Sequence, residues 1–291
     1  MPMKYAYADR WWSSDDGLRH YARDYPGSSG RARLPVICLH GLTRNSADFE
    51  GVAPYIATLD RRVIVPDFRG RGRSQYDPNP MNYNIFVYAK DVADLCDSLG
   101  IGSAIFIGTS MGGLTMMVLS TLRPTLIKSA VLNDVGPILS PVGLTRIAAY
   151  AGTKPGPIKT WQDAGALIAR SNSPAFPDYG PADWEGFARR VYHRTKGGRL
   201  RPAYDRGIME PMKAVVPGAF DMTPYYLSLA EGRRVLLVRG AISDLLDEDT
   251  AQAMAVHGDF HRVDIDRVGH APMLTEPAAR AAIVDFLESQ A

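Results

Sequence analysis

Short, unbroken apolar runs recur along the chain, and stretches with helical spacing lie between them. The runs cover residues 36–39, 63–65, 104–107, 130–132 and 235–238. Such runs are typical of strands covered on both faces, as in a parallel sheet. From Ile85 to Leu99 apolar positions are three and four residues apart and end before Gly100, which predicts an amphipathic helix. The alternation predicts an α/β fold, with a mostly parallel sheet flanked by helices.

The alternation stops between Pro137 and Met222, where aromatic residues, prolines and short helical patterns replace the apolar runs. It resumes with the run at 235–238, a helix near 249–256, a strand near 260–265 and a last helix at 277–287. We therefore predict a core of residues 1–136 and 223–291, and an inserted, mostly helical subdomain of residues 137–222. Most of its aromatic and methionine side chains should form a small core, while a few line a pocket. The pocket candidates are Trp161, Trp184, Met209 and Met212.

Composition excludes several classes of protein. The chain has 291 residues, of which 46% are hydrophobic and 22% charged, so it can form a folded core. Its net charge of +2 is too small to drive non-specific binding to nucleic acid or to an anionic membrane. Cys38 and Cys96 lie in apolar stretches and do not resemble a disulfide framework. Because no signal peptide or membrane span is recognisable, we expect a cytoplasmic protein.

The most informative local motif is the G-x-S-x-G at residues 108–112, directly after a predicted strand and before a predicted helix. A turn this sharp forces the central residue, Ser110, into strained dihedral angles, and Gly108 and Gly112 remove side chains that would clash. Ser110 is therefore the predicted nucleophile. A phosphate-binding loop would need a lysine after its last glycine, and a dinucleotide site would need G-x-G-x-x-G; neither is present.

With four further motifs, this turn resembles the α/β-hydrolase family, in particular its serine esterase and enol-lactonase-like branch with a helical cap. The motifs are His40-Gly41-Leu42, the stretch from Asp67 to Ser74, the stretch from Gly240 to Asp244, and Gly269-His270-Ala271-Pro272. In the family the serine, the acid and the histidine follow in that order. The resemblance implies a triad of Ser110, Asp244 and His270. It also implies an oxyanion hole formed by the backbone N–H groups of Leu42 and Met111, and no metal or organic cofactor.

Other assignments compete with these. Asp134 also follows a predicted strand, and some family members place the acid there; we expect Asp244 to be the acid and Asp134 to be a hinge or pocket residue. His257 and His261 have the spacing of two zinc ligands on a helix, but Gly258 and the following strand argue against that site. A basic cluster is expected to build a structural loop rather than an anion site. It consists of Arg61, Arg62, Arg69, Arg71 and Arg73.

The resemblance predicts a serine hydrolase that cleaves carboxylic ester or lactone bonds of small molecules through an acyl-enzyme on Ser110. A serine hydroxyl needs an imidazole to take its proton, and His270 would do so. Carbon–carbon bond hydrolases are an alternative, although they typically carry an aromatic residue where this chain has Ala271. Perhydrolases and acyltransferases start from the same acyl-enzyme. A non-catalytic small-molecule receptor that retains the triad is a further alternative from another class.

Overall fold

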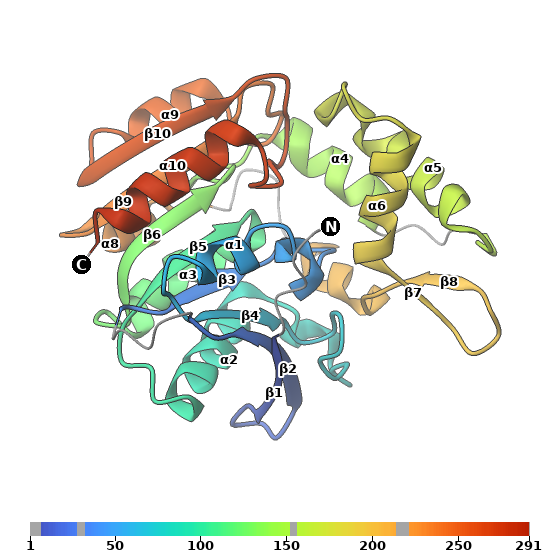
Figure 1. Cartoon of the computed structure of the whole chain (residues 1–291), viewed down its shortest axis with the longest axis horizontal. Helices are drawn as coiled ribbons and strands as arrows, with labels where there is room; N and C mark the ends of the chain where they lie inside the picture. Colours follow the sequence, from blue (N-terminus) through green and yellow to red (C-terminus); the bar gives the residue numbers. More distant parts are fainter. Residues whose placement is uncertain (1–6, 28–32, 152–155, 214–220, 291) are drawn as a thin grey trace.

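In the computed structural model, residues 7–27, 33–151, 156–213 and 221–290 are described. They form an eight-stranded sheet in the order β1-β2-β4-β3-β5-β6-β9-β10 (Figure 1). The strands are β1 (Ala8–Ser13), β2 (Arg19–Tyr25), β3 (Val36–Leu39), β4 (Val63–Asp67), β5 (Ala104–Thr109), β6 (Ile127–Asn133), β9 (Arg234–Gly240) and β10 (Asp259–Ile265). From β4 to β10 all neighbouring strands are parallel. The predicted mostly parallel sheet is confirmed.

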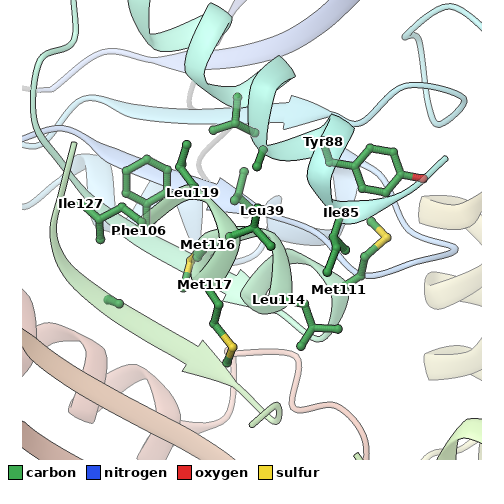
Figure 2. Packing of buried hydrophobic residues seen from close by; sticks show 14 of the residues in the cluster. Leu39, Ile85, Tyr88, Phe106, Met111, Leu114, Met116, Met117, Leu119 and Ile127 are labelled. Carbon is green, nitrogen blue, oxygen red and sulfur yellow. The ribbon is translucent and has the colours of Figure 1, made fainter. Parts of the chain in front are cut away.

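Helices cover both faces of this sheet. They are α1 (Ala53–Ala57), α2 (Ile85–Ser98), α3 (Met111–Leu122), α8 (Thr223–Ala230), α9 (Glu248–Met254) and α10 (Pro277–Glu288), with single 3-10 turns η1 (Ser46–Phe49) and η2 (Pro80–Asn82). On one face, side chains of α2, α3 and α8 pack on the strands, and Figure 2 shows Leu39 and Phe106 of the sheet beside Leu114 and Leu119 of α3. On the other face α1 and α10 form a second core. Both faces of the parallel strands are therefore apolar.

The edge hairpin of β1 and β2 was not predicted. These strands pair antiparallel with each other, and β2 pairs antiparallel with β4. Both strands contain charged as well as aromatic residues, and most of β1 is exposed. An edge strand with one solvated face lacks the unbroken apolar run that identified the inner strands.

Between β6 and β9, the 137–222 segment is mostly helical, and its longer helices lie together on the right in Figure 1, beside the sheet. Its elements are α4 (Pro141–Ala151), α5 (Trp161–Asn172), η3 (Ser173–Ala175), α6 (Pro181–Val191), the hairpin β7 (Tyr192–Arg194) and β8 (Leu200–Pro202), η4 (Arg206–Met209) and α7 (Glu210–Lys213). Residues 152–155 and 214–220 of the segment lie outside the described residues. The exact domain boundaries stay a prediction. No helix in the described part of the chain has the length and apolar character of a membrane span.

Candidate active site

The side chains that could carry chemistry lie just beyond the carboxyl ends of the parallel strands. Ser110 follows β5, Asp134 follows β6, and His270 lies in the loop after β10. Parallel strands all end at the same edge of the sheet, so residues far apart in sequence meet there. The distances between them show a single chain of hydrogen bonds.

Ser110 is held in a strained backbone conformation at the turn between β5 and α3. Its φ is 52° and its ψ is −116°, in a region that residues other than glycine rarely adopt. A Cβ on Gly112 would overlap the backbone carbonyl of Leu39, and one on Gly108 would lie 2.6 Å from the nitrogen of Gly113. The glycines therefore allow the tight turn at Ser110, as the sequence predicts.

His270 connects Ser110 to a buried carboxylate. Its Nε2 lies 3.0 Å from Ser110 Oγ, and its Nδ1 lies 2.8 Å from Asp134 Oδ2. Because a carboxylate only accepts, Nδ1–H donates to Asp134 and Nε2 is left to accept the serine proton. Asp134 also accepts from Gly240 N–H at 2.8 Å and from Ser243 Oγ at 2.7 Å. The arrangement has the geometry of a Ser-His-Asp triad.

The prediction that Asp244 contacts His270 is wrong. The carboxylate of Asp244 forms a bidentate ion pair with Arg146 of α4, with Oδ1 2.7 Å from Nη2. Although burial acts in the opposite direction, the hydrogen bonds from Arg146 keep the pKa of Asp244 below its usual value. Asp134, expected to be a hinge or pocket residue, takes the place beside the histidine.

The path of the loop before His270 explains why the histidine contacts Asp134 and not Asp244. The loop crosses directly over the end of β9, because a Cβ on Gly240 would lie 2.5 Å from the backbone oxygen of Gly269. Since β6 is the neighbour of β9, the crossing brings His270 to Asp134. Asp244 lies four residues beyond β9, on the side where α4 packs. Ser243 completes the hydrogen bonding of Asp134 and was not predicted as a site residue. Its position in the loop directly after β9 is the feature of the sequence that could have indicated this role.

A polar side chain at the end of β6 connects the loop that carries Ser110 to the loop that carries His270. Asn133, the last residue of β6, donates from Nδ2 to Thr109 Oγ1 at 3.0 Å and to the carbonyl of Pro272 at 2.8 Å. The backbone carbonyl of Asn133 accepts from Ser110 N–H at 3.0 Å. One buried amide thus fixes the distance between the two loops. Asn133 was not among the predicted site residues.

Leu42 and Met111, the predicted oxyanion residues, line the same cavity as Ser110. Met111 is the first residue of α3, where backbone N–H groups have no partner within the helix. The peptide group that carries Leu42 N–H is fixed by His40, whose Nδ1–H donates to Gly41 O at 2.8 Å while Nε2 accepts from Phe68 N–H at 3.1 Å. Burial lowers the pKa of His40 to about 3, so it stays neutral and can do both.

The cavity beside Ser110 has a volume of about 300 Å³ and is bounded mainly by apolar side chains. They come from α2, α3, α4, η4, α7 and the loops that precede α4 and follow β9: Ile85, Phe86, Leu114, Leu139, Leu144, Ile147, Ile208, Pro211, Met212 and Leu245, beside Tyr83, Asn84 and Tyr88. The polar atoms of the last three are bonded elsewhere: Tyr83 OH to Asp205, Asn84 to its own helix start, and Tyr88 OH to Arg71. The cavity suits an apolar group next to the serine.

Of the four pocket candidates in the 137–222 segment, only Met212 lines this cavity. Trp184 is buried against Phe176, Tyr179 and Phe187 inside the segment. Trp161 lies under the guanidinium groups of Arg189 and Arg194, and Met209 is buried in the core on the α3 side of the sheet. The prediction that these three line the pocket is wrong, because an aromatic or methionine side chain signals burial but not which space it faces.

The arginines of the basic cluster form ion pairs and hydrogen bonds within the protein. Arg69 is buried and pairs with Asp16, Asp77 and Asp91. Arg62 pairs with Asp24 and Arg73 pairs with Asp9. Arg61 donates to three backbone carbonyls, and Arg71 donates to the carbonyl of Leu42. In the described ranges no group of three or more histidine, cysteine, aspartate or glutamate side chains could hold a metal ion.

The fold and this site define the class of the protein. Residues 35–155 match the family model of the alpha/beta hydrolase fold. The chain is 34% identical to the 3-hydroxybutyrate-oligomer hydrolase of Cupriavidus necator over 281 residues, which cover 94% of both proteins. The chain therefore belongs to the α/β-hydrolase family and is a hydrolase.

Two solved structures are similar over nearly the whole chain. An alpha/beta hydrolase from Novosphingobium aromaticivorans is 42% identical and has a TM-score of 0.90, covering 97% of this chain and 98% of its own. E-2-(acetamidomethylene)succinate hydrolase is 25% identical with a TM-score of 0.79, covering 97% of this chain and 100% of its own. Both include the region of the 137–222 segment in their coverage.

Proposed function

We propose that the protein hydrolyses carboxylic esters of small molecules through an acyl-enzyme on Ser110. The observation that carries the proposal is the hydrogen-bonded chain from Ser110 through His270 to Asp134, which opens into an apolar cavity. Lactones, which are cyclic esters, are included because the same attack opens them.

Acylation begins when Ser110 Oγ attacks the ester carbonyl and its proton passes to His270 Nε2. The carbonyl oxygen becomes an oxyanion, which the N–H groups of Leu42 and Met111 stabilise. Donors of this kind each contribute about 3 to 4 kcal/mol in comparable sites. Asp134 stabilises the imidazolium form of His270 while it holds the proton. His270 then protonates the leaving alcohol, and the acyl group stays on Ser110.

Deacylation repeats the sequence with water. His270 takes a proton from the water, the resulting hydroxide attacks the acyl carbon, and the serine leaves with the proton returned by His270. The products are a carboxylic acid and the free enzyme. The acyl group lies in the apolar cavity during both steps, so its chain length should decide which esters are cleaved.

Short oligoesters of 3-hydroxy acids are the first natural substrates to test. The hydrolase of Cupriavidus necator is named for 3-hydroxybutyrate oligomers, and the similarity extends over almost the whole of both chains. Each unit of such an oligomer is a four-carbon acyl group, a size that a cavity of about 300 Å³ holds. The experiment is a hydrolysis screen of 3-hydroxybutyrate dimer and trimer with p-nitrophenyl esters of graded chain length and aliphatic and aromatic lactones.

Replacing Ser110 by alanine should abolish turnover while leaving the fold intact, because the nucleophile is lost and nothing else is disturbed. A fluorophosphonate probe should label the native protein at Ser110, as mapped by peptide mass spectrometry, and circular dichroism should be unchanged in the variant. Ser129, buried in β6 and away from the cavity, offers a matched control: Ser129→Ala should keep both labelling and activity. Labelling that survives in Ser110→Ala would contradict the assignment.

A further inference from the structure

Arg71 is a buried cation in the loop after β4, next to the candidate active site. Its side chain has no exposed surface, and in the described part of the chain its guanidinium group contacts carbonyl oxygens, a phenol hydroxyl and a sulfur atom but no carboxylate. Arg69, two residues earlier, pairs with three carboxylates. Burying a cation without a counter-charge costs free energy, and a role in the function of the protein would explain why Arg71 is buried here.

The guanidinium group of Arg71 contacts both residues that we expect to bind the oxyanion. Nε–H donates to the carbonyl of Leu42 at 3.0 Å, and Nη2 lies 3.5 Å from the sulfur of Met111. Nη1 donates to the backbone carbonyl of Arg69 at 2.8 Å and to Tyr88 OH at 2.6 Å. The group therefore lies between the loop after β3 and the first turn of α3, and connects the two.

The loop that presents Arg71 is itself fixed to the 137–222 segment. Gly72 N–H donates to the carbonyl of Ala203 at 2.7 Å, and Asp205 N–H donates to the carbonyl of Gly70 at 2.7 Å. Arg71 also forms an isolated antiparallel bridge with Tyr204. Contacts on both sides of Arg71 leave its backbone little freedom, so the side chain can act as a rigid support.

We propose that Arg71 is a positioning residue of the oxyanion hole, in addition to His40. It holds the backbone of Leu42 by its carbonyl and the side chain of Met111 by its sulfur, and so keeps their N–H groups converged on one point. The inference rests on the proposed acyl-enzyme chemistry of Ser110. A displacement of about 1 Å at such a donor is enough to lose much of its effect.

The charge of Arg71 adds to this geometric effect. The ester substrate is neutral, whereas the tetrahedral intermediate carries a negative oxygen between Leu42 and Met111. A buried cation favours the second state over the first, because it attracts the negative oxygen and its hydrogen-bond partners include no carboxylate that would offset its charge. Arg71 should therefore matter more for the tetrahedral state than for substrate binding.

The test compares two inhibitors in Arg71→Met and Arg71→Lys. An alkylboronic acid accepts the Ser110 oxygen at boron and becomes a tetrahedral anion as the serine proton moves to His270. The carboxamide with the same alkyl chain stays planar and neutral. In Arg71→Met the inhibition constant of the boronic acid should rise about tenfold to hundredfold and kcat should fall by a similar factor, while the carboxamide changes less than about threefold. Arg71→Lys, which keeps the charge, should recover part of the boronic acid affinity.

Arg61 provides the matched control. It is also fully buried and held by backbone carbonyls, at the amino ends of the strands and away from Ser110. Arg61→Met should lower stability without changing the ratio of the two inhibition constants. If that ratio changes equally in both arginine variants, or if both inhibitors weaken together in Arg71→Met, Arg71 has only a structural role and the proposal is overturned.

A second variant, Tyr88→Phe, and a labelling measurement complete the test. If Arg71→Met does not fold, Tyr88→Phe removes one anchor of the guanidinium, and it should change the ratio in the same direction by a smaller factor; an unchanged ratio there and in Arg71→Lys overturns the proposal. Labelling of the native protein by a fluorophosphonate separates the two hypotheses. A protein without labelling at Ser110 would contradict the acyl-enzyme, whereas a labelled protein with an unchanged ratio would contradict only the role of Arg71.

Discussion

At the scale of single residues, the site depends on the environment of one carboxylate. Asp134 is completely buried, lies at a φ of 53°, and accepts hydrogen bonds from Gly240 N–H, Ser243 Oγ and His270 Nδ1. Three donors around one buried carboxylate offset the cost of its burial and fix its orientation. The strained backbone of Asp134 is thus maintained by the contacts that hold the histidine.

Replacing Asp134 by asparagine should lower kcat by a factor of about 10³ to 10⁴ and leave the protein folded. An asparagine has a single acceptor oxygen, which Gly240 N–H requires, so its NH2 group would face His270 Nδ1 and favour the wrong tautomer of the histidine. Asp244→Asn is the matched control, because it alters a carboxylate in the neighbouring loop that pairs with Arg146. We expect it to change kcat less than about tenfold, measured with a p-nitrophenyl ester; the reverse order would return the acid role to Asp244.

At the scale of elements, the sheet supplies the reacting groups and the 137–222 segment supplies much of the wall around them. Ile147 of α4, Ile208 of η4 and Met212 of α7 line the Ser110 cavity. None of the residues in the hydrogen-bonded chain comes from this segment. We therefore propose that it acts as a cap that selects the substrate and leaves the chemistry to the strand ends.

Shortening side chains of this wall should redistribute activity among substrates. Ile147→Ala and Met212→Ala enlarge the cavity, so kcat/KM should rise for long acyl chains relative to short ones. Each additional methylene group of the substrate that the cavity can hold should change the discrimination by about 1 to 3 kcal/mol. The measurement is a series of p-nitrophenyl esters of increasing length.

Trp184→Ala is the control for this series. Trp184 is buried among other aromatic rings and does not line the cavity. Its loss should lower stability by about 3 to 5 kcal/mol, while the folded variant scales all substrates by one factor. If Ile147→Ala and Met212→Ala also scale all substrates equally, the segment does not select them.

At the scale of the whole molecule, two buried histidines link stability to pH. Burial lowers the pKa of His40 to about 3, and burial together with the charge of Arg69 lowers that of His20 to about 4. The usual value is near 6.5, so below that pH the unfolded chain binds protons that the folded chain does not. Stability should therefore fall as the pH is lowered from 6.5, by up to about 1.4 kcal/mol per pH unit for each histidine.

His40→Gln should flatten this dependence. A glutamine keeps a donor and an acceptor but does not titrate, so the slope of unfolding free energy against pH between 6.5 and 4.5 should decrease by up to about 1.4 kcal/mol per pH unit. Urea unfolding at a series of pH values measures both slopes. Equal slopes in the variant and the native protein would show that His40 is not kept neutral by the fold.

The sequence by itself determined the inner strands, the amphipathic helix α2 and the turn that carries Ser110. These features depend on local physics, because an unbroken apolar run must be buried on both faces and a turn as sharp as residues 108–112 requires glycines on both sides. The free, buried states of Cys38 and Cys96 follow from the same apolar surroundings.

Only the tertiary structure decided between Asp134 and Asp244, and showed which side chains face the cavity. Both carboxylates follow strands, so no local pattern separates them. The order of the strands and the crossing of the 268–270 loop over Gly240 bring His270 to the end of β6. The difference between Arg69, which pairs with carboxylates, and Arg71, which contacts the proposed oxyanion residues, is likewise invisible in a stretch of alternating arginines and glycines, because these partners are distant in sequence. Contacts between distant segments are set by strand register and loop paths, which hydrophobic patterning does not encode.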